Sequence, residues 1–335
     1  MSARRIAYLS FTERGAALAE QLRAALGGTA SCTRRIEGFS LPQWTAEAVG
    51  AFDARVVVGA VGIAVRAVAP FLKSKARDPA VVAVDECGRF AVPVVSGHLG
   101  GANDLAREIA AICGAVAVIT TATDANGLFA VDEWAKHQNC AVTDPHGIKA
   151  VSARILAGET VRVRSEWTVE GECPVGVALT DGPDWDVWVD VRRHEGGLCL
   201  TPKALVLGVG CRRGTPREAL ETAFRELYTE QNLWLEAVCG AATIDLKAEE
   251  AGLLDFCAAH GWPLTCYSAE ELRRAEGTFP PSAFVEQTTG VDNVCERSAV
   301  LAGGGALLTG KHAGNGVTMA LAWRPFRLDW RWKNG

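Results

Sequence analysis

Short apolar runs alternate with amphipathic stretches along the first part of the chain. Ile6-Ala7-Tyr8-Leu9 and Val56-Val57-Val58 are each long enough for one strand, and unbroken apolar runs are typical of strands buried on both faces of a parallel sheet. An alanine- and leucine-rich segment begins at Ser10-Phe11-Thr12-Glu13, which has the spacing of a helix capping box, and stops near Gly27-Gly28. This order of strand and helix predicts an α/β fold.

A second set of runs extends the same pattern. The apolar segments 79–84 and 90–95 flank Asp85-Glu86-Cys87-Gly88-Arg89, which predicts a hairpin turn or a short loop between two strands. The amphipathic stretch that follows ends at Gly114 and is succeeded by the apolar run 116–119. We therefore expect a βαβ-like crossover in this region.

The pattern weakens in the middle of the chain and then starts again. Residues 204–210 predict a new strand, after which Thr215 and Pro216 are suited to begin a helix that runs to about Tyr228. A length of 335 residues suits two or three domains. The sequence predicts an amino-terminal three-layer α/β domain over residues 1–134, a small middle module over 135–202 and a carboxy-terminal α/β domain over 203–335.

Charge and composition exclude several classes of function. The net charge of −5 provides no basic field for nucleic acid, and the apolar run after Met1 to Ile6 is too short for a signal peptide or a membrane span. The 11 cysteines contain no CxxC pair, which favours reduced thiols and gives no close ligand pair for a metal. We expect a cytoplasmic protein that binds neither nucleic acid nor membrane.

The segment from Gly59 to Asn103 holds the densest group of reactive side chains. It contains cations, two acids and one imidazole among glycines, namely Arg66, Lys73, Lys75, Asp85, Glu86, Arg89 and His98. The loop Ser96 to Asn103 leads into a helix start, where backbone N–H groups without helical partners attract carboxylates or a developing oxyanion. The alternative is that Gly97, Gly100 and Gly101 only build a tight turn and that His98 is a solvated side chain.

Together these residues resemble a known family. The runs 62–66, 69–75 and 78–90, the Ser96 to Asn103 loop, and the carboxy-terminal runs 208–215 and 289–299 are similar to the cobalamin biosynthesis protein G family. The middle module is only weakly diagnostic, and the turn 311–315 and the tryptophan-rich tail are less typical of the family.

The resemblance implies cobalt-precorrin-5A hydrolysis in the anaerobic route to cobalamin (vitamin B12). Water opens the δ-lactone on ring A of a cobalt-tetrapyrrole, and a two-carbon unit leaves as acetaldehyde. The cobalt travels with the substrate, so the resemblance implies no cofactor and no metal held by the protein. It also implies transient contact with other enzymes of the pathway.

Such a reaction needs a base or acid and groups that bind a polycarboxylate. His98 is the first choice for proton transfer, with Asp85 or Glu86 as the alternative carboxylate. For substrate binding we predict cations, glycines and polar side chains: Arg66, Lys73, Lys75, Arg89, Ser96, Gly97, Gly100, Gly101, Asn103, Arg212, Arg213, Thr289, Gly290 and Lys311. For each cation, an ordinary solvated surface charge is the alternative.

We expect the substrate to bind in a cleft between the first and third domains, because both contribute turns rich in glycine and cations. Two other classes of function stay open. Gly59-Ala60-Val61-Gly62 would suit a nucleotide-binding dehydrogenase, although its spacing is not GxGxxG. A non-catalytic tetrapyrrole carrier or scaffold would use the same cations.

Overall fold

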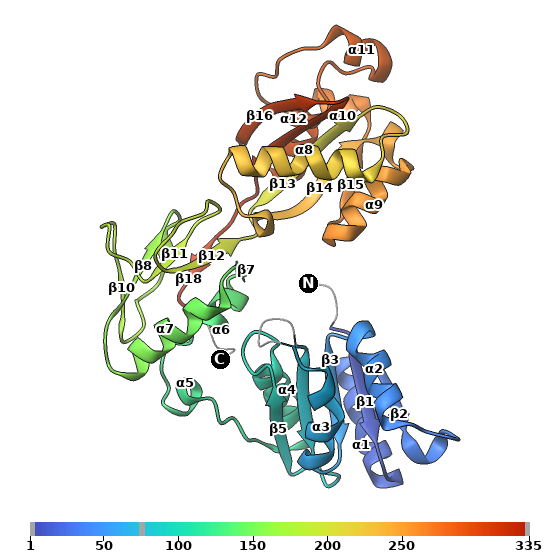
Figure 1. The fold of residues 1–335 in the computed structure, drawn as a ribbon, viewed down its shortest axis with the longest axis vertical. Helices are drawn as coiled ribbons and strands as arrows, with labels where there is room; N and C mark the ends of the chain where they lie inside the picture. The colour runs from blue at the N-terminus through green and yellow to red at the C-terminus, as the bar shows by residue number, and fades with distance from the viewer. Residues whose placement is uncertain (1–3, 74–77, 332–335) are drawn as a thin grey trace.

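The computed structural model describes residues 4–73 and 78–331. Figure 1 shows three α/β domains in chain order, the first in blue to cyan, the second in green and the third in yellow to red. The α/β class and the succession of three domains predicted from the sequence are confirmed. All 11 cysteines are free thiols.

The amino-terminal domain is built on a six-stranded sheet with the order β2-β1-β3-β4-β5-β6. Its strands are β1 (Ile6–Ser10), β2 (Thr29–Cys32), β3 (Ala54–Val58), β4 (Ala80–Val84), β5 (Phe90–Val95) and β6 (Val116–Ala117). Its helices are α1 (Glu13–Leu26), α2 (Leu41–Ala51), α3 (Val61–Val68) and α4 (Ala102–Cys113), with short 3-10 turns at η1 (Thr33–Arg35) and η2 (Ala69–Phe71).

Alternate residues of these strands enter two separate cores, which makes the domain three-layered. Val56 and Val82 pack beneath α1 and α4, whereas Val57 packs with Ala64 of α3 on the opposite face. Strand β5 runs antiparallel to β4 and parallel to β6, so the predicted hairpin and the β5-α4-β6 crossover are both present. Helix α1 begins after Thr12, whose hydroxyl accepts the Gly15 N–H.

The middle domain combines a five-stranded sheet, ordered β10-β8-β11-β12-β7, with helices from residues 122–156 and a short strand from the end of the chain. Its elements are α5 (Ala122–Ala125), α6 (Val131–His137), β7 (Cys140–Val142), α7 (Pro145–Leu156), β8 (Val161–Ser165), β9 (Val169–Glu170), β10 (Val177–Leu179), β11 (Val187–Val189) and β12 (Leu198–Pro202). Strand β18 (Leu328–Asp329) returns from the end of the chain to pair with β9.

Two of the predicted domain limits, at residue 134 and at the end of the chain, differ from the packing, whereas the boundary at residue 202 falls between β12 and the next strand, which begins at Leu205. The boundary expected at residue 134 falls inside α6, and Phe129 and Trp134 lie in the core of the middle domain. Trp330, assigned to the third domain, stacks on Trp134 with ring centroids 5.0 Å apart. The middle domain is therefore discontinuous in sequence, because large aromatic side chains near residues 130 and 330 complete its core.

The carboxy-terminal domain has a second mixed sheet, with the order β15-β14-β13-β17-β16. Its strands are β13 (Leu205–Cys211), β14 (Val238–Ile244), β15 (Leu264–Tyr267), β16 (Leu307–Gly314) and β17 (Val317–Trp323). Its helices are α8 (Arg217–Glu230), α9 (Ala251–His260), α10 (Ala269–Arg273), α11 (Ala283–Thr289) and α12 (Cys295–Gly303), with 3-10 turns η3 (Leu235–Ala237) and η4 (Asp245–Lys247).

Helices cover both faces of this sheet. Leu207 of β13 packs with Phe224 of α8 and Phe256 of α9 in one core, while α12 lies against the other face at Gly208. A Cβ atom at Gly208 would collide with the Cys295 carbonyl, so only glycine permits this approach. The predicted Thr215 cap is wrong, since α8 begins after Pro216 and the Thr215 hydroxyl donates to the Arg212 carbonyl instead.

Candidate functional site

The loop that joins β5 to α4 is closed on itself. The Ala102 N–H donates to the Ser96 carbonyl at 3.1 Å, and the Asn103 N–H donates to the Gly97 carbonyl at 3.0 Å. These two amides, which we expected to be free for an anion, are therefore already paired, and that expectation is wrong for them. The glycines fit the turn: Gly101 has φ +81°, and a Cβ at Gly97 would lie 2.8 Å from Asn103 Oδ1.

His98 belongs to this loop. It is only 6% exposed, and its side chain lies between two carboxylates. Its Nδ1 is 3.0 Å from Asp132 Oδ1 and its Nε2 is 2.7 Å from Asp124 Oδ2. Burial alone lowers the pKa of His98, but hydrogen bonds and charge from Asp132 and Asp124 outweigh it and raise the pKa to about 9. The ring is therefore protonated near neutral pH and donates to both carboxylates.

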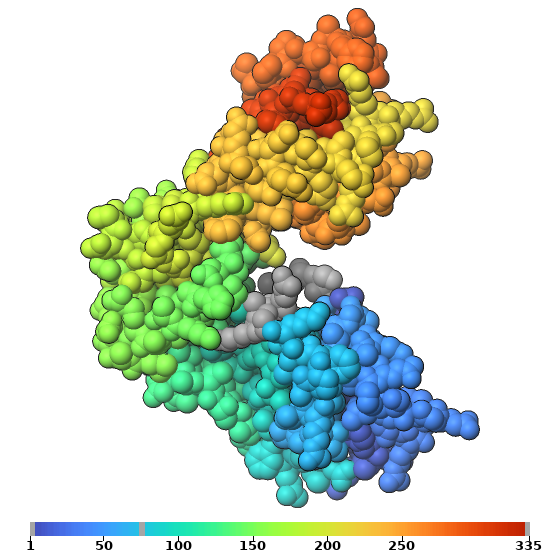
Figure 2. Space-filling model, viewed as in Figure 1, coloured from blue at the N-terminus to red at the C-terminus, as the bar shows by residue number. Residues whose placement is uncertain are grey.

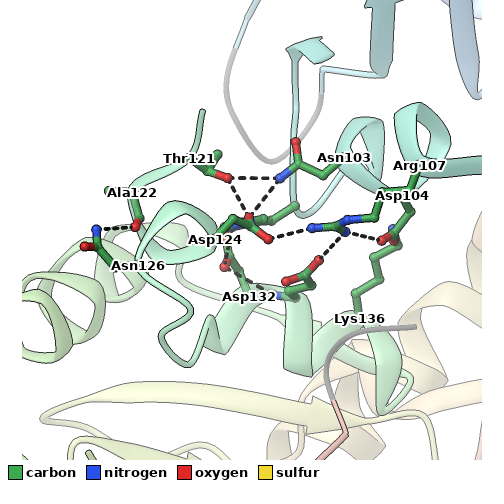
Figure 3. A network of polar contacts seen from close by, with 11 residues as sticks. Asn103, Asp104, Arg107, Thr121, Ala122, Asp124, Asn126, Asp132 and Lys136 are labelled. Atoms are coloured by element: carbon green, nitrogen blue, oxygen red, sulfur yellow. Dashed lines mark hydrogen bonds and ion pairs between the residues drawn. The ribbon is translucent and has the colours of Figure 1, made fainter. Parts of the chain in front are cut away.

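The same network continues to α6, as Figure 3 shows. Arg107 of α4 donates to Asp124 at 2.6 Å, to Asp104 at 3.1 Å and to Glu133 at 3.4 Å. Lys136 of α6 lies 2.8 Å from Asp104. We call the group His98, Asn103, Asp104, Arg107, Thr121, Asp124, Asp132, Glu133 and Lys136 the polar joint, because it ties the amino-terminal domain to the middle domain.

The charges in the polar joint are matched closely. Burial raises the pKa of Asp124, but hydrogen bonds from Thr121 and His98 and the charge of Arg107 outweigh it, so the pKa is lowered. Burial and the charge of Asp124 raise the pKa of Glu133. Among the residues of the polar joint, only His98 and Asn103 were predicted from the sequence as site residues.

Two sets of side chains here have the spacing of metal ligands. One ligand atom each from His98, Asp124 and Glu133, or from Asp104, Glu133 and His137, lies within 4.8 Å of the others. Arg107 and Lys136 already supply the positive charge that a metal ion would bring to these carboxylates. The donor set therefore suits a structural ion-pair network.

Asp85, Glu86 and Arg89 lie at the opposite end of β5 from His98. The Asp85 carboxylate accepts the N–H groups of Cys87, Arg89 and Phe90 at 2.7–2.9 Å, which fixes the β4–β5 turn. Glu86 accepts the Thr12 hydroxyl at 2.8 Å. The six residues of β5 span roughly 20 Å, so the structure does not bring these acids together with His98.

The other predicted residues of this domain are dispersed. Arg66 is exposed on α3, and its side chain has no partner among the described residues. The Lys73 N–H donates to Asp78 at 2.7 Å, while its ammonium is exposed. Ser96 donates to the Asp78 carbonyl at 2.7 Å, Gly100 packs on Ser96, and Lys75 lies outside the described residues.

A large pocket lies in the carboxy-terminal domain, at the carboxyl ends of β13 and β14. Its volume is about 1210 Å³, and Arg212, Arg213, Thr289 and Lys311 all line it. Ligands of α/β sheets commonly bind outside the carboxyl ends of the strands, where neighbouring connections diverge. We call this the C-terminal pocket; the structure brings four predicted residues together in it from three separate stretches of sequence.

Three cations of the C-terminal pocket lack a partner. The side chains of Arg212, Arg213 and Lys311 are exposed and make no hydrogen bond or ion pair within the described ranges 4–73 and 78–331. Arg and Lys in this state bind carboxylates with charge-assisted hydrogen bonds. The fifth predicted residue, Gly290, lies just outside the lining, where it ends α11 in the left-handed conformation.

The acidic side chains that line the C-terminal pocket differ in whether they are already paired. Glu250 accepts from Lys247 at 2.9 Å and from the Gly214 N–H at 2.6 Å, which lowers its pKa, and Asp292 is paired with Arg297 at 2.9 Å. Glu249 is exposed and unpaired among the residues described. The pocket can therefore bind carboxylates at its cations and offers Glu249 as a proton acceptor.

Figure 2 shows the molecule hollowed between the amino-terminal and carboxy-terminal domains, next to the middle domain. The C-terminal pocket, however, is lined entirely by residues from 210 to 318. No residue of the loop from Ser96 to Asn103 contributes to it. The expectation of a single pocket shared by the first and third domains is therefore wrong for this pocket.

Comparisons with known proteins agree on one family across the chain. Models of the cobalamin synthesis G C-terminus, the cobalamin synthesis G N-terminal region and the cobalamin biosynthesis central region match residues 205–322, 43–124 and 129–205. The central match begins before residue 134, as the core of the middle domain does.

The chain is also similar to individual proteins. It is 35% identical to the cobalt-precorrin-5A hydrolase of Salmonella typhimurium, over 94% of this chain and 97% of that protein. It is 34% identical to the cobalt-precorrin-5A hydrolase of Priestia megaterium, over 81% of this chain and 78% of that protein. A crystal structure of a cobalamin biosynthesis protein G homologue from Sulfolobus solfataricus is 22% identical with a TM-score of 0.42, and covers 96% of this chain and 98% of that one.

Within the described residues, the longest apolar helices fall short of what a bilayer crossing requires.

Proposed function

The chain belongs to the cobalamin biosynthesis protein G family, and from this premise we propose that it is a cobalt-precorrin-5A hydrolase whose substrate binds in the C-terminal pocket. The observation that carries this proposal is the match at 35% identity along nearly the whole length of a cobalt-precorrin-5A hydrolase. A dehydrogenase has no support from these comparisons.

The pocket has the chemistry that this substrate requires. A cobalt-tetrapyrrole with acetate and propionate arms needs a pocket large enough for the macrocycle, with several cations around it. Arg212, Arg213 and Lys311 supply the cations, and a volume of about 1210 Å³ exceeds that of common small-molecule pockets, which run from about 300 to 1,000 Å³. Their lack of partners leaves them free to bind substrate.

Lactone opening requires an activated water and donors for the oxyanion, and carbon–carbon cleavage then releases acetaldehyde. Glu249 is the unpaired acid of the pocket and is our proposed proton acceptor. His98, Asp85 and Glu86 stay predictions as catalytic groups, and none of the three lines this pocket. We further propose that cobalt arrives with the substrate and that the protein needs no cofactor of its own.

The decisive experiment is incubation with cobalt-precorrin-5A and trapping of released aldehyde. The hydrolase is expected to form acetaldehyde in proportion to the substrate consumed. A carrier or scaffold would only shift the absorption spectrum of the pigment, and that result would overturn the proposal. Location in the cytoplasm and transient contact with other enzymes of the pathway stay predictions.

Two variants separate binding from chemistry. Arg212→Ala should raise KM because it removes a carboxylate-binding group. Glu249→Gln should lower kcat with less change in KM, because the amide cannot accept the proton. Equal activity of both variants with the unmodified protein would place the reaction elsewhere.

A further inference from the structure

Two large apolar side chains stand exposed at the C-terminal pocket. Phe284 is 72% exposed and Leu246 is 66% exposed, and both line the pocket together with the unpaired cations. Removing such side chains from water by contact with an apolar surface is favourable. Because both side chains are exposed beside the unpaired cations, a bound molecule can contact them.

The helix that carries Phe284 is held at its ends and by Val285, which packs against a small core cluster of the domain. No residue of α11 (Ala283–Thr289) is buried. At its start, the Ser282 N–H donates to the Asp292 carbonyl at 2.9 Å, and at its end Arg273 Nε donates to the Gly290 carbonyl at 3.0 Å. These contacts fix the helix without using Phe284, so this side chain is not required by the core of the domain.

Leu246 is likewise an exposed side chain on a segment that other residues hold in place. It lies in the 3-10 turn η4 (Asp245–Lys247), directly after the carboxyl end of β14. Its neighbour Lys247 is tied to Glu250 by an ion pair of 2.9 Å, which anchors the turn while Leu246 faces solvent. Two independent segments thus bring exposed apolar side chains to the pocket that also holds the three unpaired cations.

We infer that Phe284 and Leu246 bind the apolar face of the macrocycle, while Arg212, Arg213 and Lys311 bind the carboxylates at its edge. This inference rests on the proposed function. A tetrapyrrole polycarboxylate has an apolar ring surface surrounded by charged arms, which is the complement of apolar side chains among cations. The two side chains then make the pocket specific for macrocyclic over open-chain polycarboxylates.

Other exposed apolar side chains supply matched controls. Val175 is 88% exposed in the middle domain and Leu254 is 43% exposed on α9, and neither lines the pocket. Isolated apolar residues of this kind are common on protein surfaces. Replacing either of them with alanine removes exposed apolar area at a site away from the pocket.

The experiment measures dissociation constants by absorbance and tryptophan fluorescence for two probes. The first is uroporphyrin, a macrocycle with acetate and propionate arms, and the second is butanetetracarboxylate, which is an open chain. Phe284→Ala and Leu246→Ala should each weaken uroporphyrin binding by about tenfold and leave butanetetracarboxylate binding unchanged. Val175→Ala and Leu254→Ala should alter neither, and Arg212→Ala should weaken both.

Unchanged uroporphyrin binding in the Phe284→Ala, Leu246→Ala double variant, with the Arg212→Ala effect intact, would overturn the inference while leaving the proposed function standing. Failure of the unmodified protein to release acetaldehyde would instead refute the proposed function. A double variant that loses self-association in size-exclusion chromatography but binds uroporphyrin normally would assign these side chains to a contact between copies, which also overturns the inference. Thermal unfolding should be unaffected, because both side chains are exposed.

Discussion

In the polar joint each cation pairs with a carboxylate, whereas in the C-terminal pocket Arg212, Arg213 and Lys311 form no ion pair with the residues that the structure describes. His98 lies between Asp124 and Asp132, and Arg107 donates to three acids. Both regions consist of the same types of side chain beside glycine-rich turns. The difference shows that residue types alone identify only a polar region. Whether its cations are paired with carboxylates distinguishes a contact between domains from a surface that is free to bind a ligand.

The comparison also bears on the first interpretation of the sequence. The loop Ser96 to Asn103 drew attention because it is rich in glycine and leads to a helix start. In the structure the first amides of the helix that follows are bonded to carbonyls of the loop, and both ring nitrogens of His98 contact carboxylates. The polar joint is thus a connection between domains, and the unpaired cations that line the C-terminal pocket lie in the third domain.

The largest effect is expected from His98→Ala. Removing the buried imidazolium takes one charged partner from both Asp124 and Asp132, and breaking a buried ion pair in this way typically costs about 3–5 kcal/mol. Urea unfolding, followed by tryptophan fluorescence, should show this loss. A variant that keeps its stability but loses turnover would contradict the structural interpretation and support the prediction that His98 is catalytic.

The pH dependence of stability tests the same histidine without removing it. The pKa of His98 is about 9 in the folded protein against its ordinary value of 6.5, so its contribution is fully present below pH 6.5 and is lost as the pH rises through 9. The expected loss is about 3 kcal/mol. Unfolding free energies at several pH values, compared with His98→Gln, should show this slope only in the unmodified protein.

A smaller effect in free energy is expected from the pair Arg212→Ala and Lys311→Ala. Each removes a cation that has no partner within the described ranges, so stability should stay the same while KM rises by about 10- to 100-fold. Steady-state kinetics and thermal unfolding measured on the same samples would test both statements. Marked destabilisation by either substitution would show that these cations are structural after all.

The smallest effect is expected from Glu86→Gln. Glu86 is exposed, and its only described contact is the Thr12 hydroxyl, a bond that an amide oxygen also accepts. Turnover and unfolding free energy should both stay within experimental error. A large fall in kcat would contradict its position at the far end of β5 and restore it as a catalytic carboxylate.

The sequence alone determined the local elements and much of the third-domain site. Apolar runs identified β1, β3 and β13, and the turn 85–89 forms as predicted. Arg212, Arg213, Thr289 and Lys311 were chosen from separate motifs and line one pocket. Periodicity and turn chemistry are local properties, which is why the sequence carries them directly.

Only the tertiary structure decided which charges are paired and which core each aromatic residue joins. Trp330 packs on Trp134 from the far end of the chain, and Asp132 meets His98 across a domain boundary. Phe284 and Leu246 show no motif at all, and their exposure became visible only in the folded chain. Contacts between residues distant in sequence depend on how the domains pack, and no local pattern encodes that packing.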